Sequence, residues 1–179
     1  MKEADYRCLI KLFEDCFYAD YQTRLVAGDD EPLYQPASDA NGDHQVIFAH
    51  GFFASALHEV AHWCIAGAAR RQRVDYGYWY EPDGRSATQQ SLFEQVERKP
   101  QALEWLFSAC AGVPFQVSVD NLGGIEVDRA AFTAAVRTQL VTYLQNQSLP
   151  PRAERFAQAL AAYYQQSYRS VVCQFLASA

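Results

Sequence analysis

Two histidines and a glutamate in residues 58–62 have a spacing that suits metal chemistry. His58 and His62 stand four positions apart, and Glu59 follows His58 directly. On a helix, side chains four positions apart leave the same face about 6 Å apart along the axis, so both imidazoles can reach one ion. Glu59 lies about 100° further round, where its carboxylate can touch a metal-bound water without binding the ion. This H-E-x-x-H motif predicts a divalent-metal site.

A site with two histidines needs a third protein ligand, and a later segment of the chain offers carboxylates for it. The third ligand in such sites is usually a carboxylate, often from a glutamate on a later helix. Glu94 and Glu97 lie three positions apart in a segment with helical spacing, and Glu97 comes thirty-five residues after His62. That separation leaves room for a strand and a turn. We expect Glu97 to be the third ligand, with Glu94 as the alternative.

The motif also has to be held by regular structure, and the apolar pattern predicts which elements do this. Apolar residues surround the motif nearly all round, so we expect a buried helix from about residue 53 to residue 70. Further helices are predicted at residues 3–18, 86–112, 128–145 and 151–164, with Pro100 either kinking the second of these or starting a new helix. Strands are predicted at residues 23–27, 74–80 and 115–119.

These elements predict the α+β fold class. We expect a mostly helical single domain over residues 1–179, with a few short strands and a metallopeptidase-like (zincin-like) core around the motif helix. Half of the residues are hydrophobic, which is enough for one substantial core. No linker rich in proline, glycine or serine divides the chain.

Charge and cysteine content narrow the classes of function and location. The formal net charge of −6 argues against direct nucleic-acid binding and against binding to anionic membranes. No stretch approaches the roughly 20 apolar residues of a membrane span, and residues 1–6 do not begin a secretion signal. Five cysteines without a C-x-x-C pair suit reduced thiols. We therefore expect a cytoplasmic protein. No pattern fixes the oligomeric state, and a monomer is our expectation.

Acidic and aromatic residues outside the motif are candidates for substrate binding. Asp29, Asp30 and Glu31 follow one another in a loop and can form a negative rim for a cationic substrate. Tyr76 and Tyr78, in the predicted strand 74–80, can flank an ammonium group through cation–π contacts. Each feature also has an ordinary interpretation, either as a solvated turn or as part of an aromatic core strand.

Several segments resemble the elongation factor P hydroxylase family. They are residues 28–32, 46–67, 74–85 and 93–106, which include the motif and occupy most of the first two thirds of the chain. The resemblance implies a non-haem iron monooxygenase that hydroxylates the modified, β-lysyl-bearing lysine of bacterial elongation factor P, a late step in the maturation of that factor. It also implies molecular oxygen as cosubstrate. Beyond about residue 127 only general helical character is matched.

The resemblance also assigns roles to the candidate residues. It implies that His58 and His62 bind Fe(II), that Glu97 is the carboxylate ligand, and that Glu59 handles protons or supports the ligands. Two imidazoles and one carboxylate hold Fe(II) while leaving positions open, although zinc or another divalent ion can take the same ligands. No residue pattern indicates the reductant or a pocket for 2-oxoglutarate.

Two other functions stay open at the level of sequence. Read alone, the motif indicates a zinc-dependent peptidase or amidase in which Glu59 is the general base on a metal-activated water. The third possibility is a metal-stabilised partner of the translation apparatus that has no enzymatic activity.

Overall fold

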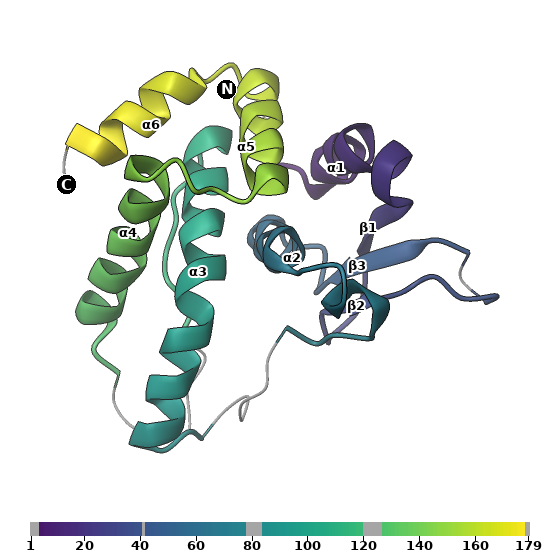
Figure 1. The fold of residues 1–179 in the computed structure, drawn as a ribbon, viewed down its shortest axis with the longest axis horizontal. Coiled ribbons are helices and arrows are strands. Elements are labelled where there is room, and N and C mark those ends of the chain that lie inside the picture. The colour runs from purple at the N-terminus through teal and green to yellow at the C-terminus, as the bar shows by residue number, and fades with distance from the viewer. Residues whose placement is uncertain (1–3, 41, 78–83, 120–126, 178–179) are drawn as a thin grey trace.

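The structure, a computed structural model, describes residues 4–40, 42–77, 84–119 and 127–177. Helices dominate and a small sheet accompanies them, which confirms the α+β class (Figure 1). The elements in chain order are α1 (Tyr6–Tyr21), β1 (Thr23–Ala27), β2 (Leu33–Gln35), β3 (His44–Phe48), α2 (Phe53–Ile65), the 3₁₀ helix η1 (Arg70–Gln72), α3 (Ala87–Ala111), α4 (Arg129–Gln145), α5 (Pro151–Tyr163) and α6 (Tyr168–Ala177). None of the described helices is long and apolar enough to cross a membrane.

Three short strands form one mixed sheet in the order β1-β3-β2. β1 runs parallel to β3, with Thr23 opposite His44. β2 runs antiparallel along the other edge of β3, with Leu33 opposite Ile47. α1 packs against β1 and α2 packs against β3, so the sheet lies beside the helix that carries the motif (Figure 1).

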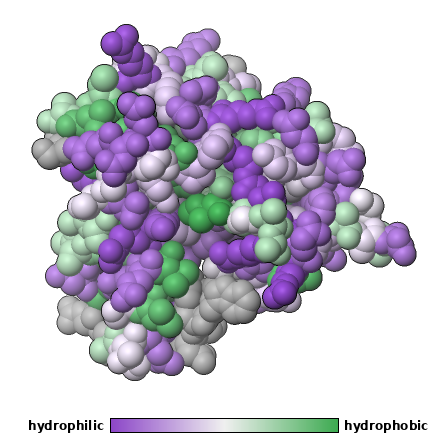
Figure 2. All heavy atoms as spheres, viewed as in Figure 1, coloured by the Kyte–Doolittle hydropathy of each residue, from purple (hydrophilic) through white to green (hydrophobic). Residues whose placement is uncertain are grey.

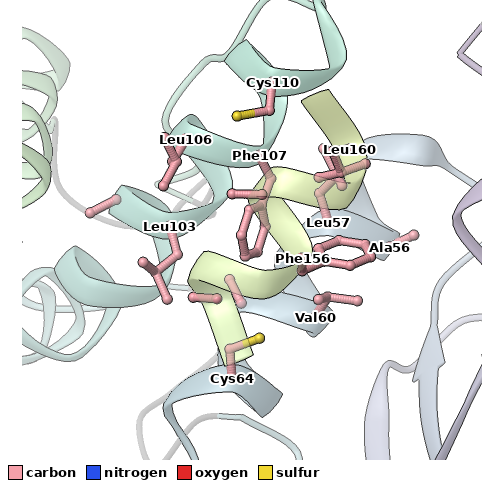
Figure 3. Packing of buried hydrophobic residues seen from close by; sticks show 14 of the residues in the cluster. Ala56, Leu57, Val60, Cys64, Leu103, Leu106, Phe107, Cys110, Phe156 and Leu160 are labelled. Carbon is pink, nitrogen blue, oxygen red and sulfur yellow. The ribbon is translucent and has the colours of Figure 1, made fainter. Parts of the chain in front are cut away.

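A central part of the hydrophobic core lies where α2, α3 and α5 meet (Figure 3). Apolar side chains of α2 recur at helical spacing and pack against matching side chains of the two other helices. Those labelled, all at most 3% exposed, are Ala56, Leu57, Val60 and Cys64 from α2, Leu103, Leu106, Phe107 and Cys110 from α3, and Phe156 and Leu160 from α5. This packing fixes the position of α2 against α3, and the geometry of the motif depends on it.

Helix α3 is one continuous element that passes through Pro100. It begins with a capping box, in which Ser86 accepts from the backbone of Gln89 while the Gln89 side chain accepts from the backbone of Ser86. It ends at Ala111 and is followed by the C-cap Gly112, whose left-handed φ of 70° suits glycine. Of the two alternatives for Pro100, a new helix at this residue is therefore wrong.

Helix α2 ends at Ile65, earlier than the predicted residue 70. Two arginines bind its last carbonyl groups. Arg71 Nη1 donates to Ala66 O at 2.6 Å, and Arg152 Nη2 donates to Cys64 O at 3.1 Å and also to Ala66 O. Charged donors are favourable at a helix carboxyl end, so side chains complete the hydrogen bonding that a longer helix would have supplied.

Two of the three predicted strands are corrected by the structure. In residues 74–77 only Asp75 pairs, in an isolated bridge with Tyr34, while residues 78–80 lie outside the described part of the chain. Residues 115–119 form no strand, because a side chain takes the place of a neighbouring strand at Ser118. The Gln101 amide donates to Ser118 O at 2.8 Å and accepts from Ser118 N at 3.0 Å. The prediction for residues 23–27 is confirmed, since these residues form β1.

The other helices agree well with the apolar pattern. The Asp128 side chain caps α4 by accepting from Ala131 N at 2.9 Å, and Pro151 occupies the first turn of α5. Two strands and one helix, β2, β3 and α6, were not predicted from the sequence.

The contact of Arg152 with the end of α2 leads to a stability prediction. Its guanidinium lies 4.4 Å from the centre of the Trp63 ring. Arg152→Leu should lower the free energy of unfolding by about 2–3 kcal/mol, because two carbonyl groups lose charged donors. Arg155→Leu on the same helix is the control. The ion pair of Arg155 with Asp20 is exposed and should contribute less than about 1 kcal/mol. Denaturant unfolding measures both, and equal losses would contradict the prediction.

Candidate metal centre

Three side chains from two helices converge on one point. His58 and His62 leave the same face of α2, and their Nε2 atoms lie 3.0 Å apart. Glu97 reaches them from α3, with Oε1 at 3.3 Å from His62 Nε2 and Oε2 at 3.5 Å from His58 Nε2. Taking one ligand atom from each residue, all three atoms lie within 4.8 Å of one another. The structure therefore brings together the two imidazoles and the carboxylate that were expected from the sequence.

The cluster is largely shielded from solvent. Glu97 is 2% exposed, and the side chains of His58 and His62 are 23% and 11% exposed. A carboxylate buried to this degree needs a cationic partner, because removing its charge from water is costly. Either protonated imidazoles or a metal ion can supply that charge at this place.

A fourth residue, Glu104, supports the cluster and was not predicted from the sequence. Its Oε2 lies 2.8 Å from His58 Nδ1. Glu104 follows Glu97 by seven residues, which is two turns of α3, so both carboxylates lie on one helix face. They contact opposite nitrogens of the His58 ring. The seven-residue spacing was visible in the sequence, but only the packing of α3 against α2 brings this face to the motif.

The donor set fits a divalent transition metal. With His58 Nδ1 donating its hydrogen to Glu104, the lone pair of Nε2 is free to bind an ion, and such carboxylate–imidazole contacts orient the ligands of metal sites. Two imidazole nitrogens and one carboxylate suit both Fe(II) and zinc. His58, His62 and Glu97 are the residues that would hold the ion.

The pKa values of His58 and Glu59 are both raised, for different reasons. Burial lowers the pKa of His58, but the hydrogen bond and charge of Glu104 and the charges of Glu97 and Glu59 outweigh it and raise the pKa to about 10. Burial raises the pKa of Glu59, and the charges of His58 and His62 only partly oppose this. Glu59 is therefore suited to hold a proton beside the metal ligands.

Glu94, the alternative carboxylate, points elsewhere. It accepts a hydrogen bond from Gln90 Nε2 at 3.1 Å, and among the described residues the metal-ligand group contains only His58, His62 and Glu97. Three residues span about 4.5 Å along a helix axis, so Glu94 is offset from Glu97 by nearly one turn of α3.

A cavity of about 640 Å³ opens onto the cluster. Among the predicted substrate residues, Asp30 and Tyr76 line it, whereas Asp29 and Glu31 are not among its described lining residues. Tyr78 lies outside the part of the chain that the structure describes. Of the predicted substrate-binding residues, one from the acidic loop at residues 29–31 and one from the predicted strand at residues 74–80 thus line the cavity beside the metal cluster.

Comparison with known proteins places the chain among hydroxylases. A sequence model of the family described as Elongation factor P hydroxylase matches residues 12–175. A protein of Haemophilus influenzae named Elongation factor P lysine hydroxylase is 50% identical over 156 residues, which is 87% of each chain. The matched span contains α2, α3 and thus the whole metal-ligand cluster.

Removal of each candidate carboxylate tests the ligand assignment. Glu97→Ala should weaken the binding of Fe(II) or Zn(II) by at least roughly 100-fold, which exceeds the usual loss for residues that only support a ligand. Glu94→Ala should change it by less than about threefold, since Glu94 lies apart from the cluster. Competition with a coloured chelator measures both affinities. The opposite ranking would move the third ligand to Glu94.

Glu104 should control metal affinity without binding the ion. Glu104→Ala is expected to weaken metal binding by about 10- to 100-fold, because the His58 ring loses the acceptor that orients it. Glu104→Gln keeps an acceptor oxygen and should lose less. Ser108→Ala, one turn further along α3, is the control and should bind like the unchanged protein. Equal affinity of Glu104→Ala and the unchanged protein would exclude this role.

Proposed function

The chain belongs to the elongation factor P hydroxylase family, and we propose that it hydroxylates the modified lysine of elongation factor P at an iron centre. The observation that carries this proposal is the convergence of His58, His62 and Glu97 at an open cavity. The substrate would be the β-lysyl-bearing lysine side chain of that translation factor, and molecular oxygen would be the cosubstrate.

Each part of the site has a task in this proposal. The bound iron would supply the activation of molecular oxygen, and it would need coordination positions that the three protein ligands leave open. Insertion of one oxygen atom into a C–H bond sends the second oxygen atom to water, which takes two protons and two electrons from an external reductant. Glu59, which is buried and has a raised pKa, is placed to hold and pass such protons.

The charge of the cavity supports a cationic substrate. Its described lining residues include Asp30, Glu59, Glu97 and Glu104 but no lysine or arginine. Residues 78–83 and 120–126, which the structure does not describe, contain no lysine or arginine either. Glu59 is suited to hold a proton, Glu97 would bind the ion and Glu104 contacts His58, so Asp30 is the carboxylate of this set that faces an incoming substrate. The ammonium group of a lysyl side chain is attracted by such a charge.

The local architecture is part of the proposal as well. The motif helix α2 packs on the small mixed sheet on one side and on α3 and α5 on the other. We propose that this is a zincin-like core, in which α3 supplies the third ligand. Because zinc can take the same ligands, the type of reaction has to be tested on the substrate.

The decisive experiment combines metal analysis with mass measurement. Protein purified without oxygen should contain iron, and its incubation with modified elongation factor P, oxygen and a reductant should add the mass of one oxygen atom to the substrate. His58→Ala and His62→Ala should stay folded but lose most of their metal and activity, because each loses one of two nitrogen ligands. Cleavage of elongation factor P would instead favour a peptidase. Tight binding without chemical change would favour a non-enzymatic partner.

A further inference from the structure

The turn before the motif helix has a strained backbone. Residues 49–52 form a tight turn that is closed by Phe52 N donating to Ala49 O at 3.2 Å. Both central residues are left-handed, His50 with a φ of 55° and Gly51 with a φ of 65°, and turns of this kind favour asparagine followed by glycine. A Cβ atom on Gly51 would also lie 3.1 Å from the Tyr6 ring. Glycine suits its position, but histidine at position 50 is unfavourable for the backbone.

Phe52 is a second residue whose type is unfavourable for stability at its position. It is the N-cap residue of α2, and its side chain makes no capping hydrogen bond. Serine, threonine, aspartate and asparagine are preferred at this position because they accept from the first free N–H groups of the helix. Phe52 is also 62% exposed, more than any other large hydrophobic residue among those described. Figure 2 shows hydrophilic residues over much of the molecular face, with smaller hydrophobic patches between them.

The two unfavourable residues, His50 and Phe52, lie together at the metal cavity. His50 and Phe52 line it, and their rings lie 5.5 Å apart. The turn is also tied to the acidic loop, since His50 N donates to Asp29 O at 2.9 Å and His50 Nδ1 lies 3.8 Å from Asp30 Oδ1. Three other described residues that are not glycine, Gln22, Gln147 and Gln165, also have a left-handed φ, and they lie at or just after helix ends; of these four residues His50 lines the cavity. Strained backbone often occurs at functional sites. An exposed aromatic group beside acidic side chains resembles the anchor and polar rim of a protein interface.

We propose that residues 49–52 form a docking lip for the folded substrate protein. Phe52 packs against an apolar surface of elongation factor P next to the modified lysine, and Asp30 attracts the ammonium group that enters the cavity. The inference rests on the proposed function for the identity of the partner. It is supported by charge complementarity, since Asp30 is 94% exposed at the side chain and lines the same cavity.

If Phe52 binds the substrate protein, its replacement should affect folding stability and substrate binding in opposite directions. Phe52→Ser supplies a preferred N-cap and should raise the midpoint temperature of unfolding while the metal content stays unchanged. For intact modified elongation factor P, KM should rise about tenfold or more, as for loss of an aromatic anchor, and kcat should change much less. KM for a short peptide that carries the same modified lysine should change far less, because the peptide lacks the surrounding protein surface.

Leu92→Ser provides a matched control. Leu92 is 49% exposed on α3 and is not among the described residues that line the metal cavity, so KM for elongation factor P should be unaffected. Equal KM values for Phe52→Ser and the unchanged protein would overturn the docking lip. So would an equal rise in KM for the protein and the peptide, since Phe52 would then act on the lysyl arm alone.

A second measurement does not depend on turnover. A photoreactive benzoylphenylalanine at position 52 keeps an aromatic side chain, and it should crosslink to elongation factor P, whereas the same group at position 92 should not. If the unchanged protein does not add an oxygen atom to elongation factor P, the proposed function is wrong. The docking lip is then decided by the Kd for elongation factor P. A Kd raised about tenfold or more by Phe52→Ser supports the lip, and an unchanged Kd rejects it.

Discussion

The metal cluster depends on how α3 holds the His58 ring from both sides. Glu97 faces Nε2 and Glu104 faces Nδ1, and the two carboxylates lie two turns apart on one helix face. This arrangement works only at one position of α3 relative to α2. The apolar contacts of α2 with α3 and α5 set that position (Figure 3). The same relative position of α2 and α3 is therefore required by the packing of the core and by the geometry of the metal site, and a shift between the two helices would change both.

The cluster also places an unusual amount of charge inside the molecule. Glu59, Glu97 and Glu104 are each at most 9% exposed, and burial of several carboxylates is unfavourable unless cations offset them. The His58 imidazole, whose pKa is raised by the neighbouring carboxylates, supplies part of that offset when it is protonated. A divalent ion would replace the proton on its Nε2, which would couple metal binding to folding at this site.

The interior of the cavity is built from well-packed helices, whereas its mouth includes a turn with unfavourable local conformation. Around the ligands, helices with well-packed apolar faces keep side chains in fixed positions, as the chemistry of a metal centre requires. At the mouth, the turn at residues 49–52 combines a left-handed His50 with an uncapped, exposed Phe52. By contrast, the N-caps of α3 and α4 are Ser86 and Asp128, whose side chains accept from backbone N–H groups of the first helical turn.

The sequence by itself determined the elements whose signals are local. The spacing of His58 and His62 and the cap at Asp128 each depend on residues within one or two helical turns. The family could also be identified, because long segments carry its pattern. Only the tertiary structure showed that Glu104 reaches His58 and that Ser118 pairs with a side chain instead of a strand. Local sequence does not distinguish a solvated helix glutamate from one that faces a partner, because the packing of distant segments decides which face of the helix is buried.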